Sequence, residues 1–335
     1  MGWCITFMRS GPMRDITIIG AGVAGLFAAW HLSRRGWNPR IIDRNGPPGP
    51  HGCSWWAGGM LAPICEGVTA DPLIARLGGQ AADDWAQVTT VTRHGTLVLA
   101  LDRDRAELSR FARRAPGHRM LDGAALAALE PDLADHRHAL HVPSEAHLDP
   151  RQALADLVTA LHDRGIAIET GEAQPQDVTG PVIDARGMAA ALPDLRGVRG
   201  EMVVLCAPDI TLSRPVRLLH PRHPLYVVPR GDGIVMLGAT QIETGTRRPI
   251  TARALLELLS AAYALDARFA ESTVLETGTD LRPAFPDNIP RVTVRGRVLH
   301  LNGLFRHGYL MAPALARQAA DYLTHGTRGE LIHED

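Results

Sequence analysis

The chain has 335 residues and a formal net charge of −1. This length exceeds what one small core holds and predicts two interlocked domains, while the near-zero charge argues against nucleic acid or an anionic membrane surface as a partner. All 35 basic residues are arginines, and the absence of lysine excludes a Schiff-base lysine, a pyridoxal-phosphate anchor and the lysine of a P-loop.

Signals for a membrane, for secretion and for metal are missing from the sequence. No run of about 18 apolar residues predicts a membrane span. Residues 1–13 form a leader without the basic region and the cleavage site of a signal peptide. The four cysteines form no C-x-x-C pair, and the 15 histidines show no metal-ligand spacing. We therefore expect no metal site, no disulfide framework and a cytoplasmic location.

The first motif is "RDITIIGAGVAGLFAAWHLSRRG", which predicts a strand, a glycine turn and a helix in that order. Gly20 would make the turn, Gly22 would let the backbone approach a pyrophosphate, and Gly25 would let the helix lie close to the strand. Asp43 ends a second strand, where an acidic residue can hold a ribose hydroxyl. The motif predicts a dinucleotide site; a glycine turn without a ligand is the alternative.

A second glycine-rich stretch, "GCSWWAGGMLAP", occupies residues 52–63. Ser54 can bond to a phosphate or to a ring atom. Ala57, Gly58 and Gly59 leave room for a flat ring against bare backbone. A packed turn of glycine and tryptophan, without a ligand, is the alternative at this position.

The middle of the chain predicts a return to the first domain. Asp149 is a helix N-cap, Pro150 is the first helical residue, and a strand follows this helix. The stretch "GPVIDARG" then predicts a buried strand that ends in Ala185 and Gly187, where Asp184 and Arg186 could form a structural ion pair.

From residue 201 to 241 the pattern changes to β-branched and aromatic residues between turn signals, which predicts an antiparallel sheet. Helical segments near 71–87, 104–114 and 251–263 are expected around this sheet, the last of them capped by Thr251. Tyr226 lies in the sheet. On composition alone, packing with a satisfied hydroxyl is favoured for Tyr226 over donation to a carboxylate.

Near the carboxyl end, "NGLFRHGYLMAP" predicts a strand-to-helix junction, with Pro313 opening the helix. Backbone N–H groups at a helix start carry partial positive charge and stabilise a developing anion. Gly308 would let the backbone approach a ring. Arg282, in "LRP", has the planar guanidinium that binds two carboxylate oxygens in parallel, although most arginines of such a chain lie on the surface.

The ordered motifs "GAGVAGL", "CSWWAGGMLAP", "YVVPR…GAT", "LRP" and "FRHGYLMAP" together resemble the flavin-dependent D-amino-acid oxidase group, and within it glycine oxidase. The resemblance covers nearly the whole chain. It implies an α/β fold in which a Rossmann-like FAD-binding domain is interleaved with an α+β substrate domain built on an antiparallel sheet. Relatives with covalent flavin use a cysteine for the bond and a lysine for oxygen activation. This chain has no lysine and no cysteine after Cys206, so the FAD should be bound non-covalently.

The resemblance also implies residue roles. Arg282 and Tyr226 would hold the substrate carboxylate, and Arg306 would lie near both substrate and flavin. The residues assigned to the cofactor are Gly20, Gly22, Val23, Ala24, Gly25, Asp43, Arg44, Ser54, Ala57, Gly58, Gly59, Met60, Gly187, Arg306, His307, Gly308, Tyr309 and Leu310. Cys53, Trp56 and Gln241 depart from the family pattern.

We expect the FAD-binding domain to comprise residues 14–80, 145–200 and 273–326, and the substrate domain to comprise 81–144 and 201–272, with a tail at 327–335. The implied reaction is hydride transfer from glycine or another small amino acid to flavin N5. The products would be an imine or 2-oxo acid, ammonia and, with O2 as acceptor, hydrogen peroxide.

By analogy, the imine would pass to a thiazole synthase in thiamine synthesis. A D-amino-acid dehydrogenase with a quinone acceptor and a non-catalytic flavin-binding protein are the alternatives. The sequence leaves open the choice among glycine, sarcosine, D-proline and other D-amino acids, and also a homo-oligomeric state.

Overall fold

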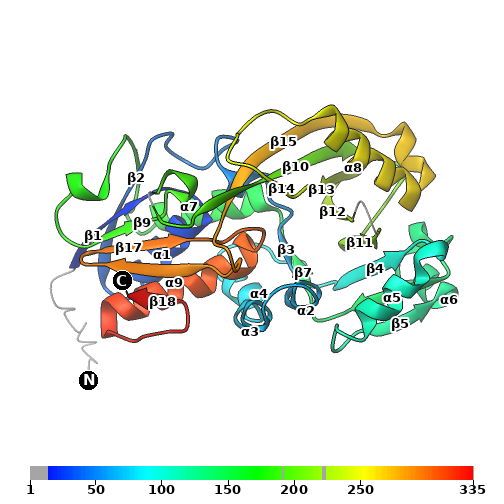
Figure 1. Cartoon of the computed structure of the whole chain (residues 1–335), viewed down its shortest axis with the longest axis horizontal. Helices are drawn as coiled ribbons and strands as arrows, with labels where there is room; N and C mark the ends of the chain where they lie inside the picture. Colours follow the sequence, from blue (N-terminus) through cyan, green and yellow to red (C-terminus); the bar gives the residue numbers. More distant parts are fainter. Residues whose placement is uncertain (1–13, 191, 221–223, 335) are drawn as a thin grey trace, which may run out of the picture.

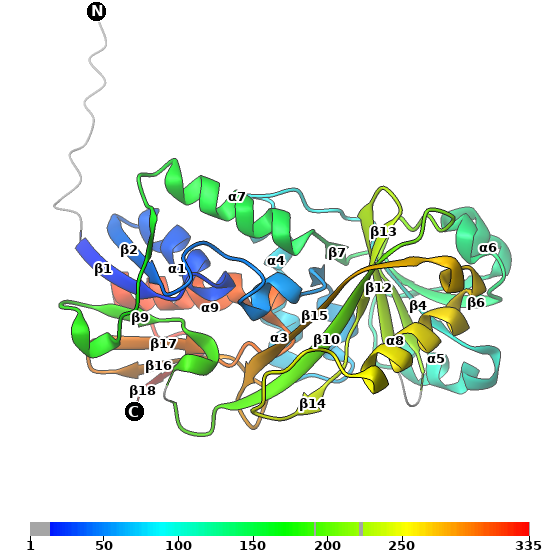
Figure 2. The ribbon, with the colours of Figure 1, turned by 90° about the horizontal axis from the view of Figure 1, so that it is seen from above.

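The computed structural model describes residues 14–190, 192–220 and 224–334, so the predicted leader lies outside the described residues. The molecule is elongated, with one large sheet toward each end (Figures 1 and 2). Two long paired strands, β10 (Arg196–Cys206) and β15 (Thr273–Ala284), extend between the two halves. In the described part of the chain, no helix combines the length and the apolar composition that a membrane crossing requires.

The sheet at the amino-terminal end has seven strands in the order β18-β16-β17-β9-β1-β2-β8. The strands are β1 (Arg14–Ile19), β2 (Trp37–Asp43), β8 (Ile168–Thr170), β9 (Val182–Asp184), β16 (Arg291–Arg295), β17 (Val298–Asn302) and β18 (Ile332–Glu334). All neighbours from β8 to β17 run parallel. The carboxyl ends of β1, β2, β9 and β17 therefore lie at one edge, where α/β sheets bind ligands. The Rossmann-like prediction is confirmed.

Three long helices belong to this half: α1 (Val23–Ser33), α7 (Pro150–His162) and α9 (Gly308–His325). Ala28 and Ala29 of α1 are fully buried, and such small side chains let α1 lie close to its neighbours. The side chain of Asp149 caps α7 by accepting hydrogen bonds from the N–H groups of residues 151 and 152, as predicted.

The predicted start of the last helix is wrong by one turn and a half. Helix α9 begins at Gly308, and Pro313 is its sixth residue rather than its first. Proline has no N–H, so the carbonyl of Tyr309 has no donor within the helix. The buried Trp85 supplies that donor, with Nε1 2.8 Å from the Tyr309 oxygen. Because the Trp85 side chain takes the place of the missing backbone donor, the helix tolerates a proline at residue 313.

The helical segment near 71–87 also differs from its prediction. It forms α3 (Pro72–Gly78) and α4 (Ala81–Trp85), which pack against α9 and not around the antiparallel sheet. The Trp85 ring stacks on the Tyr309 ring, with centroids 5.1 Å apart, and this contact joins α4 to α9 within the hydrophobic core of the amino-terminal half. The expected tail likewise adds β18 to the first sheet. The domain boundaries as a whole remain a prediction.

The second sheet contains β10 and β15 together with β4 (Thr96–Ala100), β5 (Arg119–Asp122), β6 (His138–Val142), β11 (Val216–Leu219), β12 (Leu225–Gly231), β13 (Ile234–Gly238) and β14 (Ile242–Glu243). Its pairs are antiparallel except β4 with β11. The antiparallel pattern predicted for 201–241 is confirmed, whereas the strand β15 was not predicted.

Three helices accompany this sheet: α5 (Arg105–Ala112), α6 (Gly123–Leu129) and α8 (Ala252–Leu265). Thr251 caps α8 by accepting a hydrogen bond from the N–H of Ala254, as predicted. Between the halves lie α2 (Pro63–Gly67), β3 (Met60–Leu61) and β7 (Ala146–His147), preceded by a 3₁₀ turn, η1 (Cys53–Trp56). These short elements place the second glycine-rich stretch between the two sheets.

Candidate active site

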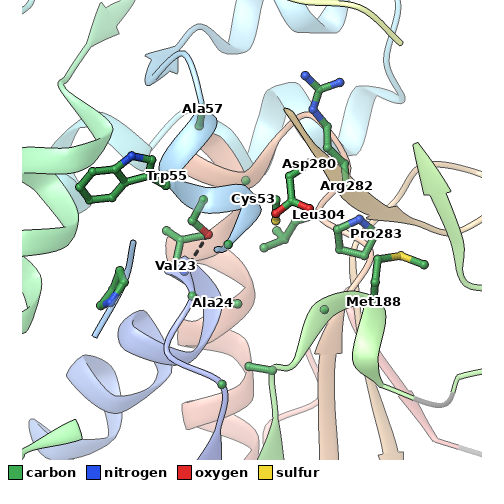
Figure 3. Close-up of a pocket in the computed structure, with 18 of the residues that line it drawn as sticks. Val23, Ala24, Cys53, Trp55, Ala57, Met188, Asp280, Arg282, Pro283 and Leu304 are labelled. Carbon is green, nitrogen blue, oxygen red and sulfur yellow. Dashed lines mark hydrogen bonds between the residues drawn. The ribbon is translucent and has the colours of Figure 1, made fainter. Parts of the chain in front are cut away.

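One cavity of about 500 Å³ lies between the two halves. All the predicted site residues line it except Gly25. Figure 3 shows residues from the start of α1, from η1 and from β15 around the same cavity. The structure therefore brings together segments that lie more than two hundred residues apart in the sequence.

The glycines of the first turn serve two purposes. Gly20 has a φ of +107°, and a Cβ there would lie 2.6 Å from the carbonyl oxygen of Ala185. A Cβ on Gly25 would lie 1.9 Å from the carbonyl oxygen of Gly20, so Gly25 makes the close helix-to-strand contact that was predicted. Gly22 instead borders the cavity, and a Cβ there would meet only the Ser54 hydroxyl, at 3.4 Å. The turn thus exposes bare backbone to the cavity.

The start of α1 faces this space and has no acidic residue in its first turn. The N–H of Val23 donates to Ser54 Oγ at 3.1 Å, the bond drawn in Figure 3. Asp43 Oδ2 accepts from the N–H of Ala21 at 2.9 Å, so this carboxylate borders the same turn. A helix start with bare backbone suits a pyrophosphate, and an acidic side chain at the end of β2 suits a ribose.

The second glycine-rich stretch is held by an arginine that was not predicted from the sequence. Arg230 donates to the carbonyl oxygens of Ala57 and Gly58 at 3.2 and 3.0 Å. Gly59 has a φ of +73°, and a Cβ there would lie 2.2 Å from the Leu148 oxygen. The positive φ and this close contact together require glycine at residue 59. The only sequence signal for Arg230 was its place at the end of "YVVPR".

Arg282 and Tyr226 border the cavity from neighbouring parts of the second sheet. The guanidinium of Arg282 lies over Gly200, where a Cβ would be only 2.0 Å from Nη2, and Nη1 donates to the Thr240 oxygen at 3.1 Å. Tyr226 lies against Gly238 in the same way. Burial raises the pKa of Tyr226, and the nearby charge of Arg282 opposes the rise, so the phenol remains a donor at neutral pH.

Arg306 and His307 contact a glutamate that was not predicted. Glu66, in α2, lies 3.0 Å from Arg306 Nε, 3.3 Å from His307 Nδ1 and 2.5 Å from Arg217 Nη2. Burial alone would raise the pKa of Glu66, but Arg217, His307 and Arg306 outweigh burial and hold that pKa well below its usual range. Glu66 is thus an anion at neutral pH. Its sequence neighbourhood carries no signal for this role.

A second unpredicted carboxylate lies two residues before Arg282. Asp280 is buried and forms an ion pair with Arg247, whose Nη2 lies 2.6 Å from Oδ1, and Arg247 also borders the cavity. Residues two apart on a strand share a face, so the position of Arg282 could have indicated Asp280. Burial, and then the charge of Asp280, raise the pKa of Cys53 to about 12, so that thiol is neutral. Figure 3 shows Cys53, Asp280 and Arg282 on one side of the cavity.

The ion pair expected between Asp184 and Arg186 is present. Arg186 lies 2.8 Å from Asp184, and His300 Nδ1 lies 3.1 Å from the same carboxylate. Gly187 follows with a φ of +58° and still borders the cavity. The strand end therefore combines a structural ion pair with exposed backbone.

The remaining predicted residues take different orientations. Gly308 has open space before it, since a Cβ would meet only Val23 at 3.9 Å. The buried Tyr309 hydroxyl lies 3.1 and 3.0 Å from the carbonyl oxygens of Ser54 and Pro150. Its side chain therefore ties α9 to η1 and α7. Arg44 borders the cavity from an exposed position.

The residues present fit a flavin dinucleotide. Bare backbone at Gly22 and Gly308, the start of α1 and the carboxylate of Asp43 supply a cradle, a partial positive charge and a ribose acceptor along one continuous cavity. The start of α9 adds a second helix terminus to that cavity.

Comparison with known proteins agrees with this geometry. The model of the DAO family, described as FAD dependent oxidoreductase, matches residues 15–322. A protein of Rhizobium etli is 52% identical over 91% of this chain and 95% of its own length. Its name is thiamine biosynthesis oxidoreductase ThiO. The glycine oxidase of Pseudomonas putida is 27% identical over 93% of this chain and 94% of its own length.

Two further matches concern a fused relative and a solved structure. The bifunctional protein ThiO/ThiG of Trichormus variabilis is 26% identical over 92% of this chain, which spans 52% of that protein. The crystal structure of glycine oxidase from Geobacillus kaustophilus has a TM-score of 0.80 at 22% identity, covering 96% of this chain and 97% of that one, and it confirms the fold. This chain therefore belongs to the DAO family of FAD-dependent oxidoreductases, and it is similar to members of that family named ThiO and glycine oxidase.

Proposed function

We propose that this protein oxidises glycine or another small amino acid at the bond between Cα and nitrogen, with O2 as final acceptor. The observation that carries the proposal is Arg282. Its guanidinium borders the cavity beside Tyr226, and among the described residues it has no carboxylate partner. A half-buried, unpaired guanidinium is a strong site for a substrate carboxylate. The match to the Pseudomonas putida glycine oxidase supports the substrate class.

In this mechanism the residues bind and orient, and no side chain has to act as an acid or base at Cα. Arg282 and the Tyr226 hydroxyl hold the substrate carboxylate, which fixes the direction of the Cα–H bond. FAD held in this cavity would supply the acceptor for a hydride and a route for two electrons to O2. The start of α9 borders the same cavity, so its N–H groups would offer partial positive charge to a flavin held there. Water then hydrolyses the imine to a 2-oxo acid and ammonia, and O2 takes up the two electrons of the amino acid and two protons to form hydrogen peroxide.

The physiological role that we propose is the supply of an imine for the thiazole of thiamine. The names of two relatives support it, since one is assigned to thiamine biosynthesis and another is a ThiO fused to ThiG. A thiazole synthase is therefore the partner we propose. We also propose that FAD is held without a covalent bond, because the neutral thiol of Cys53 is a weak nucleophile.

The test is the visible spectrum of the purified protein under anaerobic conditions, before and after glycine is added. Bleaching of the flavin band, followed by hydrogen peroxide when air is admitted, is the expected result. Bleaching without peroxide would instead favour the dehydrogenase. A flavin band that glycine, sarcosine and D-proline all leave unchanged would refute amine oxidation. Acid precipitation should release the flavin into the supernatant, and flavin retained in the pellet would refute non-covalent binding.

A further inference from the structure

The arginines that border the cavity differ in whether a carboxylate already neutralises them. Three of them are paired: Arg186 with Asp184, Arg247 with Asp280 and Arg306 with Glu66. Arg282 is half-buried and has no such partner among the described residues, whereas Arg44 is exposed. The cavity therefore offers one sheltered, uncompensated positive charge.

Glu66 borders the cavity and neutralises two arginines, of which Arg306 also borders the cavity. Its oxygens lie 2.5 Å from Arg217 Nη2 and 3.0 Å from Arg306 Nε. Arg217 is the cross-strand partner of Tyr226, so the two side chains share one face of the sheet. The charges of Arg282, Arg217 and Glu66 all act on the Tyr226 hydroxyl. The cluster thus adjoins the proposed carboxylate site.

Arg306 and Arg217 are positioned by more than this one contact. Arg306 Nη2 also donates to Thr69 Oγ1 at 2.7 Å. The Arg217 side chain is largely buried, and its Nε has no hydrogen-bond partner among the described residues. Removing the charge of Glu66 would leave two sheltered guanidinium groups uncompensated, which favours the entry of another anion.

We propose that Glu66 is a specificity-determining residue that restricts the cavity to ligands with a single carboxylate. Arg282 binds that carboxylate, and a second one would meet the anionic Glu66 and Arg306, which Glu66 already neutralises. The inference rests on the proposed role of Arg282, but it adds a rule about ligand charge that the oxidase activity does not contain.

The test uses the FAD-loaded protein and inert ligands matched in size. Malonate and its monoamide, malonamate, have the same number of heavy atoms but differ by one carboxylate, and succinate and succinamate extend the comparison to a longer spacing. Dissociation constants are measured at pH 7 and fixed ionic strength from the change in the visible flavin spectrum. The wild-type protein should bind each monoamide more tightly than the corresponding dicarboxylate.

Glu66→Gln should shift the ratio of the two dissociation constants toward the dicarboxylate by about tenfold or more, as expected for one new charge-assisted contact. Glu66→Asp, which keeps the charge, should retain the wild-type preference. The double variant Glu66→Gln/Arg306→Met should lose part of the gain. If Glu66→Gln does not retain FAD, the inference is tested by the wild-type protein alone, from its ratio of dissociation constants for dicarboxylate and monoamide.

A wild-type protein without a preference for the monoamides, or a Glu66→Gln variant with an unchanged ratio, would overturn this inference. Both results would leave the proposed oxidase intact, provided that the monoamides bind and glycine bleaches the flavin. Failure of both ligand classes to bind, together with a flavin that glycine does not reduce, would instead overturn the proposed function and this inference with it.

Discussion

The contact between Arg282 and Gly200 offers a test of the carboxylate site that leaves Arg282 itself in place. A Cβ at residue 200 would lie 2.0 Å from Arg282 Nη2, whereas ordinary contact begins at 3.4 Å. In Gly200→Ala the guanidinium must therefore move by about 1.4 Å, which is the difference between those two distances. A misplacement of about 1 Å can cost a factor of about 100 in rate. We expect kcat/KM for glycine to fall by about that factor.

The measurement is peroxide formation at varied glycine, together with FAD content and thermal unfolding. Gly200 lies within a strand and does not have a positive φ, so alanine is compatible with the backbone. Gly245→Ala is the matched control, because a Cβ there would meet nothing within 4 Å. A folded, FAD-loaded Gly200→Ala protein with the kcat/KM of the control would refute the assignment of Arg282 to the substrate carboxylate.

Three further predictions concern FAD, packing and acid. Asp43→Ala should raise the Kd for FAD by about tenfold or more, whereas Asp43→Glu should change it less, as measured by the quenching of FAD fluorescence. Trp85→Phe should cost about 1–3 kcal/mol in urea unfolding, because the buried Tyr309 carbonyl loses its donor, and adding Pro313→Ala should restore much of the loss. The pKa of Asp184 is about 2 instead of 3.8, because hydrogen bonds and charge outweigh the burial that would raise it. Asp184→Asn should therefore cost about 2 kcal/mol at pH 7, and the difference should shrink as the pH falls from 4 toward 2; a difference constant down to pH 2 would contradict this sign.

The local chemistry of the fold was well predicted from the sequence. Gly20, Gly25 and the caps Asp149 and Thr251 each act through neighbours close in the chain or through a single contact with the adjoining element. Such features leave a pattern in the residues themselves, because a turn or a cap needs particular residue types at fixed offsets. The confirmed strands of residues 201–241 belong to the same class.

The features that the sequence did not predict correctly each depend on a partner far away in the sequence. Pro313 indicated a helix start, and only Trp85, more than two hundred residues earlier, explains why it lies inside α9. Glu66 carries no signal in "APICEG", because its role comes from Arg217 and Arg306. Such contacts follow from topology and not from periodicity, so a single sequence did not reveal them.

The pairing of β10 with β15 explains how these distant residues meet. Gly200 is the register partner of Asp280, and Arg282 folds back over Gly200 two residues further along β15. The strand then continues through Pro283, whose carbonyl accepts a hydrogen bond from the N–H of Phe305, just before α9. One continuous segment thus links the proposed carboxylate site to the helix start that faces the same cavity. We therefore expect a change in the register of this pair to move Arg282 and the start of α9 together, which would couple the proposed carboxylate site to the proposed flavin site through β15.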